Sequence, residues 1–163
     1  MRSDLTWGPC ENLPHLIHRP VGAHVGRSRA QLLALPDAEL RRIQLKHHLA
    51  LATVRDGQPD VAQIATLLNA VYLAFYLEPG EPGPCRRAEA AVHDCIARGD
   101  RGGPVRLTDL ERAAIEHVLT RLDAHLATVP MHRYLAAFEQ LQRTTLAAAA
   151  SRRSPISPES AAG

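Results

Sequence analysis

The sequence predicts an all-α protein, a helical bundle of two αα-hairpins with a short intervening helix and disordered termini. Apolar residues recur at spacings of three and four over several long segments, which is typical of amphipathic helices. Gly and Pro residues separate these segments, and no stretch shows the alternation of a strand. The 163 residues suffice for one domain with a core made mainly of Leu and Ala.

The chain is expected to consist of three regions. Residues 1–27 lack periodicity and contain several Pro, Gly and His residues, which predicts an irregular N-terminal arm. Residues 28–150 are expected to form the helical bundle domain, and residues 151–163 a disordered tail rich in Ser and Pro. Within the domain, a short helix is expected near residues 28–35, ending before Pro36.

The first hairpin is expected from two long helical segments joined by residues 56–60. Asp37 is the expected N-cap of the first segment, and Gly57 and Pro59 end it. One apolar stripe is predicted to face the core, and a second stripe is predicted to broaden the buried face. The first stripe consists of Leu40, Ile43, His47, Leu51 and Val54, and the second of Leu45, Leu49 and Ala52.

The second segment, residues 61–77, contains no Asp, Glu, Lys or Arg. Asp60 is expected to cap it, and a helix without charge is usually buried on most of its surface. Gln63, Thr66 and Asn69 interrupt the apolar run, so a buried helix is favoured over a membrane span. The expected core register is Val61, Ile64, Leu68, Val71 and Phe75.

The rest of the domain follows after a connector at residues 78–84, which is expected to be non-helical because of its prolines. A short helix is predicted over residues 86–97, followed by a loop at residues 98–104. Thr108 and Glu111 have the spacing of a capping box. They are expected to begin a helix over residues 108–127, which is expected to form the second hairpin with a helix over residues 131–147.

The composition excludes several function classes. A formal net charge of +2 is too small to argue for a polyanionic partner by itself. Three cysteines, Cys10, Cys85 and Cys95, are too few for a disulfide framework and favour reduced thiols. Since the N-terminus carries no apolar leader segment, we expect a cytoplasmic protein.

No motif for catalysis or cofactor binding is found, because the chain has no Gly-x-Ser-x-Gly, Walker loop, dinucleotide fingerprint or His-Glu-x-x-His. The histidines raise the question of a metal. His117 and His125 lie two turns apart, and Glu89 and His93 lie one turn apart with Cys95 nearby, but these spacings match no metal motif. We therefore expect no enzyme activity, no cofactor and no metal, with a metal-dependent enzyme as the lowest-ranked alternative.

Tyr72 and Tyr76 lie one helical turn apart beside the main apolar stripe, with Leu73 and Leu77 alongside. If the bundle covers only one side of residues 61–77, these side chains form an exposed apolar patch, a common mark of association. The alternative is that they are buried within the monomer. We expect a protein partner or a second copy to bind this surface, with a charged contact from Arg41, Arg42 and Lys46.

Nucleic acid is the alternative partner. Residues 49–72 resemble a helix-turn-helix in outline, but the second helix is uncharged and flanked by acids, which disfavours phosphate contact. Its connector also exceeds the usual roughly three to four residues. Contact with DNA would come from two Arg-rich helix faces, whose ordinary role is a solvated surface: Arg41, Arg42 and Lys46 on one, and Arg86 and Arg87 on the other.

Four Leu- and Ala-rich segments carry a family resemblance, at residues 45–60, 66–74, 123–127 and 134–138. They resemble small uncharacterised helical proteins of proteobacterial mobile elements, some of which are labelled Fis-like regulators. The resemblance implies a helical fold and a mobile-element context, and it brings no catalytic residues. A Fis-type protein would end in a basic helix-turn-helix, whereas residues 131–147 carry only Arg133 and Arg143 as Arg or Lys residues.

The expected function is that of a cytoplasmic bacterial accessory protein of a mobile element, which acts by protein–protein binding or self-association. The alternative is a DNA-binding transcriptional regulator that uses the Arg-rich helix faces. No membrane partner is expected.

Overall fold

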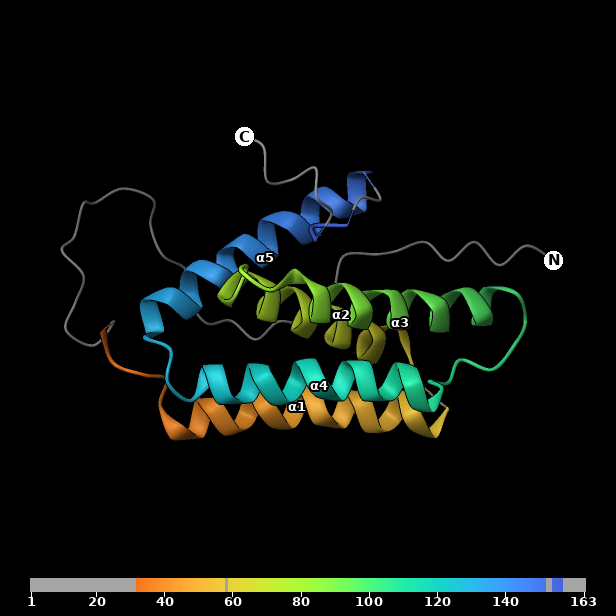
Figure 1. Ribbon diagram of the computed structural model, residues 1–163, viewed down its shortest axis with the longest axis horizontal. Helices are drawn as coiled ribbons and strands as arrows, with labels where there is room; N and C mark the ends of the chain where they lie inside the picture. Colours follow the sequence, from red (N-terminus) through yellow and green to blue (C-terminus); the bar gives the residue numbers. More distant parts are fainter. Residues whose placement is uncertain (1–31, 58, 152–153, 157–163) are drawn as a thin grey trace.

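The computed structural model describes residues 32–57, 59–151 and 154–156, and in them the chain folds into five helices without a strand (Figure 1). The predicted all-α class is therefore confirmed for this part of the chain. The predicted N-terminal arm, residues 1–27, lies outside the described residues. The helices are α1 (Asp37–Asp56), α2 (Val61–Leu77), α3 (Pro82–Asp100), α4 (Asp109–Leu126) and α5 (Met131–Ser151).

The central helix of the bundle is α2. It packs against each of the other four helices, whereas α1 and α3 each contact α4 as well as α2. The ribbon shows α1 and α4 side by side along one edge, while α5 crosses at an angle along the opposite edge (Figure 1). The buried apolar cluster draws on all five helices, so a single core fills the space around α2.

The turn between α1 and α2 is built as the sequence predicts. Gly57 ends α1 with a φ of 84°, and its N–H donates to the carbonyl of Val54 at 3.3 Å. Asp60 caps α2, because its Oδ1 accepts from the N–H groups of Ala62 and Gln63 at 2.8 and 3.1 Å. The Asp60 N–H donates in return to Gln63 Oε1 at 2.7 Å. The two helices pack together, as the first predicted hairpin requires.

The described part of the segment before α1 differs from the short helix predicted near residues 28–35, of which residues 28–31 lie outside the described residues. Residues 33–36 are not helical, and Ala34 forms an isolated antiparallel bridge with Pro130. The N–H of Met131 donates to the carbonyl of Leu33 at 2.8 Å. These backbone contacts attach the start of the described chain to the start of α5.

The second predicted hairpin is wrong in its packing. The capping box of Thr108 and Glu111 forms at the start of α4 as predicted, but α5 packs chiefly on α2 rather than along α4. The bridge at Pro130 holds the chain at the connection between the two helices. Because α2 has no charged residue, it offers α5 an apolar surface to cover.

Two helix starts also differ from the sequence prediction. The N-cap of α1 is Pro36, and Asp37 lies in the first turn rather than at the cap. The prediction that residues 78–84 are non-helical is wrong from Pro82 onward, where α3 begins. Proline is tolerated there because the first N–H groups of a helix have no partner within the helix. At its other end α3 continues to Asp100, beyond the predicted boundary.

The buried side of α2 includes residues outside the predicted register. Val61 is 51% exposed, and Ile64, Leu68 and Phe75 are only partly buried. Without charges to mark an outer face, tertiary packing decides which residues of α2 are buried. No described helix has the length and hydropathy that a bilayer crossing requires. The buried positions are Leu67, Ala70, Val71, Tyr72, Leu73 and Leu77.

The prediction of a disordered tail is wrong for residues 154–156. Ile156 is 1% exposed and belongs to the core cluster. Its carbonyl accepts a hydrogen bond from Arg86 Nε of α3 at 3.2 Å. Burial of this aliphatic side chain favours the docking of a short segment of an otherwise polar tail. Residues 157–163 lie outside the described residues.

Replacement of Leu67 by alanine should lower the free energy of unfolding by about 2–5 kcal/mol, because it opens a cavity in the core. Leu68→Ala removes the same atoms from the next position of α2, which is only partly buried, and should cost less. Urea denaturation followed by circular dichroism measures both values. A larger loss for Leu68→Ala would contradict the assigned orientation of α2.

Candidate functional site

The outward side of α1 carries two exposed leucines one turn apart. Leu45 and Leu49 are 59% and 57% exposed, so the prediction that both broaden the buried face is wrong. The helix buries its opposite side against α2 and α4, which leaves these leucines facing outward. The buried residues of α1 are His47, Ala50, Leu51 and Val54.

Three basic side chains surround this apolar pair. Arg41, Arg42 and Lys46 are all exposed, and the structure brings these three predicted contact residues onto one surface with the leucines. The Nη2 atom of Arg42 lies 3.0 Å from Glu39 Oε1, an exposed pair that contributes little to stability. We call this surface the α1 outer face, and it consists of Arg41, Arg42, Leu45, Lys46 and Leu49.

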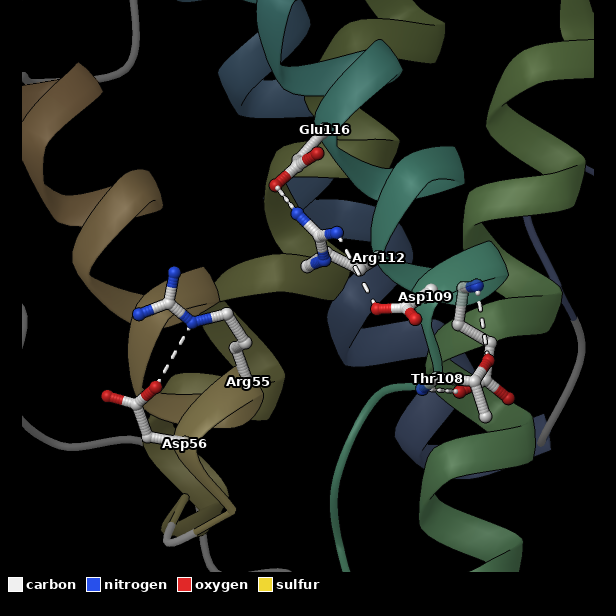
Figure 2. Close-up of polar contacts among 7 residues, drawn as sticks. Arg55, Asp56, Thr108, Asp109, Arg112 and Glu116 are labelled. Atoms are coloured by element: carbon white, nitrogen blue, oxygen red, sulfur yellow. Dashed lines mark hydrogen bonds and ion pairs between the residues drawn. The ribbon is translucent and has the colours of Figure 1, made fainter.

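The C-terminal end of α1 carries a different balance of charge. Figure 2 shows Arg55 beside Asp56, with 3.1 Å between Nε and Oδ1. On the neighbouring α4, Arg112 lies between Asp109 and Glu116, at N–O distances of 3.6 and 3.0 Å (Figure 2). Basic and acidic groups therefore alternate at this end of α1 and the neighbouring start of α4, whereas Arg41, Arg42 and Lys46 make the α1 outer face mainly basic, with Glu39 beside Arg42.

Tyr72 and Tyr76 do not form the exposed patch that the sequence analysis expected. Tyr72 is 7% exposed, and its hydroxyl donates to Glu89 Oε1 of α3 at 2.7 Å. Burial, together with the neighbouring Glu89, raises the pKa of Tyr72 well above its usual value. The hydroxyl of Tyr76 shares a hydrogen bond of 2.6 Å with Thr144 Oγ1 of α5. The two tyrosines therefore join α2 to α3 and α5 within the monomer.

Arg86 and Arg87 are exposed on α3 and do not extend the α1 outer face. Both α2 and α4 pack against α1 and also against α3, so they lie between the two basic regions. Arg86 also binds within the chain, through its hydrogen bond to the carbonyl of Ile156. The two Arg-rich faces of the sequence analysis are thus separate surfaces.

The interface of α1 with α4 contains two adjacent histidines and a carboxylate. His48 Nε2 lies 2.7 Å from Asp123 Oδ2. His47 is 8% exposed, and burial lowers its pKa to about 4, although the nearby Asp123 acts in the opposite direction. Within the described structure, neither His47 Nδ1 nor Asp123 Oδ1 has a hydrogen-bond partner. His47 is therefore a neutral group of the interface at pH 7, and acid opposes its burial.

A shallow hollow near the turn from α2 to α3 gathers several polar groups. Arg121 of α4 lies 2.8 Å from Glu78 Oε2 and 2.7 Å from Glu81 Oε2, and His125 Nδ1 lies 3.8 Å from Glu78 Oε2. Cys85 lines the same hollow, and burial raises the pKa of its thiol to about 11. A protonated thiol beside carboxylates paired with arginine offers no activated nucleophile. This network of charges therefore joins α4 to the α2–α3 turn.

The residues considered for a metal do not assemble into a site. Among the residues that the structure describes, no group of three or more His, Cys, Asp or Glu side chains could hold a metal ion. His93 and His117 are exposed, whereas Glu89 and Cys95 are buried. Burial raises the pKa of the Cys95 thiol, and Glu89 already accepts a hydrogen bond from Tyr72.

The chain matches no protein-family model, no curated protein and no solved structure. The family resemblance drawn from the sequence therefore stays a prediction.

Two features of these surfaces differ from what the sequence predicted, the outward position of Leu45 and Leu49 and the docking of Ile156. One feature of the sequence indicates that Leu45 and Leu49 face outward: Arg41 and Arg42 lie about one turn before Leu45 on the same side of the helix. The docking of Ile156 had a weaker signal, a single aliphatic residue in a polar tail. Neither signal identifies what binds the surface.

The stability of the bundle should fall on acidification, partly through His47. Its pKa is about 4 in the folded chain and ordinarily 6.5, so between these pH values the unfolded chain binds a proton that the folded chain does not. The free energy of unfolding should therefore decrease as the pH falls through this window, with a share of up to about 3 kcal/mol for His47.

Urea denaturation at a series of pH values tests this share. His47→Gln should flatten the pH dependence between about pH 6.5 and 4, because it removes the titrating group from the interface. His117→Gln, at an exposed position of α4, is the matched control and should follow the wild-type curve. Parallel curves for His47→Gln and the wild type would contradict the assignment.

Proposed function

We propose that the chain is a protein-binding accessory protein that associates with a second copy of itself through the α1 outer face. This surface replaces the tyrosine patch of the sequence analysis, because Tyr72 is buried. The proposal keeps the expected mode of action, which is self-association, and the expected charged contact from Arg41, Arg42 and Lys46.

The observation that carries the proposal is the exposure of Leu45 and Leu49. Each leucine leaves more than half of its surface in water, at 59% and 57% exposed. They lie one turn apart near the middle of a 20-residue helix, so one contact can cover both. An apolar centre with a polar rim is the usual composition of a protein interface.

The distribution of charge along α1 favours an antiparallel arrangement of two copies. In a two-fold contact that places Leu45 opposite Leu49 of the other copy, the exposed Asp56 lies near the start of the other α1. Asp56 is then about one helical turn from Arg41 and Arg42 of that copy. A parallel arrangement would instead bring the basic side chains of both copies together, which disfavours it.

Self-association should be lost when the leucine pair is made acidic. The wild-type chain should show a mass that rises with concentration in sedimentation equilibrium, whereas the Leu45→Glu/Leu49→Glu variant should stay monomeric, because the contact would bury two charges from each copy. Leu110→Glu is the matched control, since Leu110 is 86% exposed on α4, and it should behave as the wild type. A wild-type chain that remains a monomer at high micromolar concentration would refute the proposal.

The orientation of the two copies has its own test, a charge exchange. Arg41→Asp should weaken the association, and addition of Asp56→Arg should restore part of it, because the pair of opposite charges is rebuilt across the contact. Thermal unfolding of both variants controls for stability. Equal weakening by the single and the double variant would contradict the antiparallel arrangement.

Nucleic-acid binding is the second candidate, since Arg41, Arg42 and Lys46 are exposed on one helix. These residues lie apart from Arg86 and Arg87, and the net charge of the chain is only +2. Both observations favour the first candidate. We expect no shift of a fluorescent DNA duplex at about 50 mM salt, where phosphate contacts are strong. Binding that weakens steeply with salt and is lost in the Arg41→Ala/Lys46→Ala variant would favour the regulator instead.

A further inference from the structure

Two of the three basic side chains on the α1 outer face lie near a carboxylate. Arg42 Nη2 is 3.0 Å from Glu39 Oε1. In the antiparallel contact, Asp56 of the other copy lies about one helical turn from both Arg41 and Arg42. Lys46 lies about 12 Å along the helix from the level of that Asp56, and it forms no ion pair with any described residue. The contact therefore leaves the charge of Lys46 without a carboxylate.

The packing of α1 explains why Lys46 has no acidic neighbour. Lys46 and His48 lie on opposite sides of the leucine pair, since a helix turns by about 100° per residue. His48 Nε2 is 2.7 Å from Asp123 Oδ2, so the side of His48 faces α4. The side of Lys46 borders α2, against which α1 also packs. Because α2 contains no Asp or Glu, it supplies no carboxylate there.

The antiparallel contact brings the two copies of Lys46 together. When Leu45 lies opposite Leu49 of the other copy, the two-fold axis passes at the level of His47, one residue from Lys46. The two lysines are then about 3 Å apart along the helices, whose axes pack about 8–10 Å from each other. A two-fold axis perpendicular to both helices also keeps the lysines on the same side of the contact. Their flexible side chains can therefore direct both ammonium groups to one point.

Two ammonium groups at this distance oppose association. Their repulsion is modest in water and grows where the contact excludes water. An anion with at least two negative charges between them would replace this repulsion by two attractive interactions. Phosphate-type oxyanions suit the position, because lysine binds them as a point charge and their several oxygens can accept hydrogen bonds from both sides.

We propose that a small phosphate-type oxyanion binds between the Lys46 side chains of two associated copies and strengthens their contact. The inference rests on the proposed function, since neither copy forms the site alone. A small anion fits better than a nucleic-acid backbone, because a long polyanion is held by many basic groups along its length. Arg86 and Arg87, the other arginines considered for nucleic acid, lie beyond α2 and α4.

Sedimentation equilibrium of the full-length chain at pH 7 tests the site in sodium chloride and in sodium phosphate of equal ionic strength. Equal ionic strength keeps the general screening of charge the same in both salts. The dissociation constant of the self-associated form should be at least about threefold lower in phosphate, because the anion offsets the repulsion of the two lysines.

The Lys46→Gln variant separates the anion site from general effects of phosphate. It should associate more tightly than the wild type in chloride, because both like charges are removed, and phosphate should no longer strengthen its association. Arg87→Gln, at an exposed basic position of α3, is the matched control and should keep the wild-type response. Thermal unfolding checks that both variants are folded.

The outcomes distinguish this site from self-association itself. Equal association of the wild type in the two salts would overturn the anion site alone, and so would a phosphate response that persists in Lys46→Gln. A single-stranded oligonucleotide that replaces phosphate at a far lower phosphate concentration would assign the site to nucleic acid and overturn the assignment to a small anion. A wild-type chain that stays monomeric in both salts would refute the proposed function, and the anion site with it.

Discussion

The bundle depends on the burial of α2, a helix of 17 residues without a single charged side chain. Such a helix is favourable only where other elements cover most of its circumference. A single hairpin with α1 covers one side, and α3, α4 and α5 together cover the rest. Because α2 must be covered on several sides, α5 packs on α2 rather than along α4, the helix that precedes it in the sequence. The fold is therefore organised around a central helix and is not a pair of independent hairpins.

The local features of this fold could be predicted from the sequence, because they depend on neighbouring residues. The caps at Asp60 and Thr108 and the stop at Gly57 all follow from short-range hydrogen bonding and backbone freedom. The side of each helix that is buried could not be predicted in the same way. Leu45 and Leu49 fit an apolar stripe as well as Leu51 and Val54 do, and only tertiary packing separates the two sets.

In the candidate site, too, some features follow from neighbouring residues on one helix, and others depend on the packing of helices against each other. Arg42 and Lys46 could be placed together from sequence, because residues three or four apart on a helix share one side, and Arg41 adjoins Arg42. Burial of Tyr72 was one of two alternatives open from the sequence, but the partner of its hydroxyl, a carboxylate 17 residues away on α3, could not be predicted. Polar contacts between helices leave no periodic signal in the sequence, and the position of Glu89 in a helix of mixed character gives no hint of its burial.

This packing leaves the outer side of α1 uncovered, whereas part of α3 is covered by the described tail residues. The α1 outer face is apolar at its centre, and its contact can be made with the helix as it stands. At α3, by contrast, the chain covers its own surface, because residues 154–156 contact Arg86 and Glu89. Since α2 and α4 lie between α1 and α3, the outer side of α1 and the docked tail lie on separate parts of the bundle. A contact through the α1 outer face, as proposed, would therefore leave the tail of each copy in place.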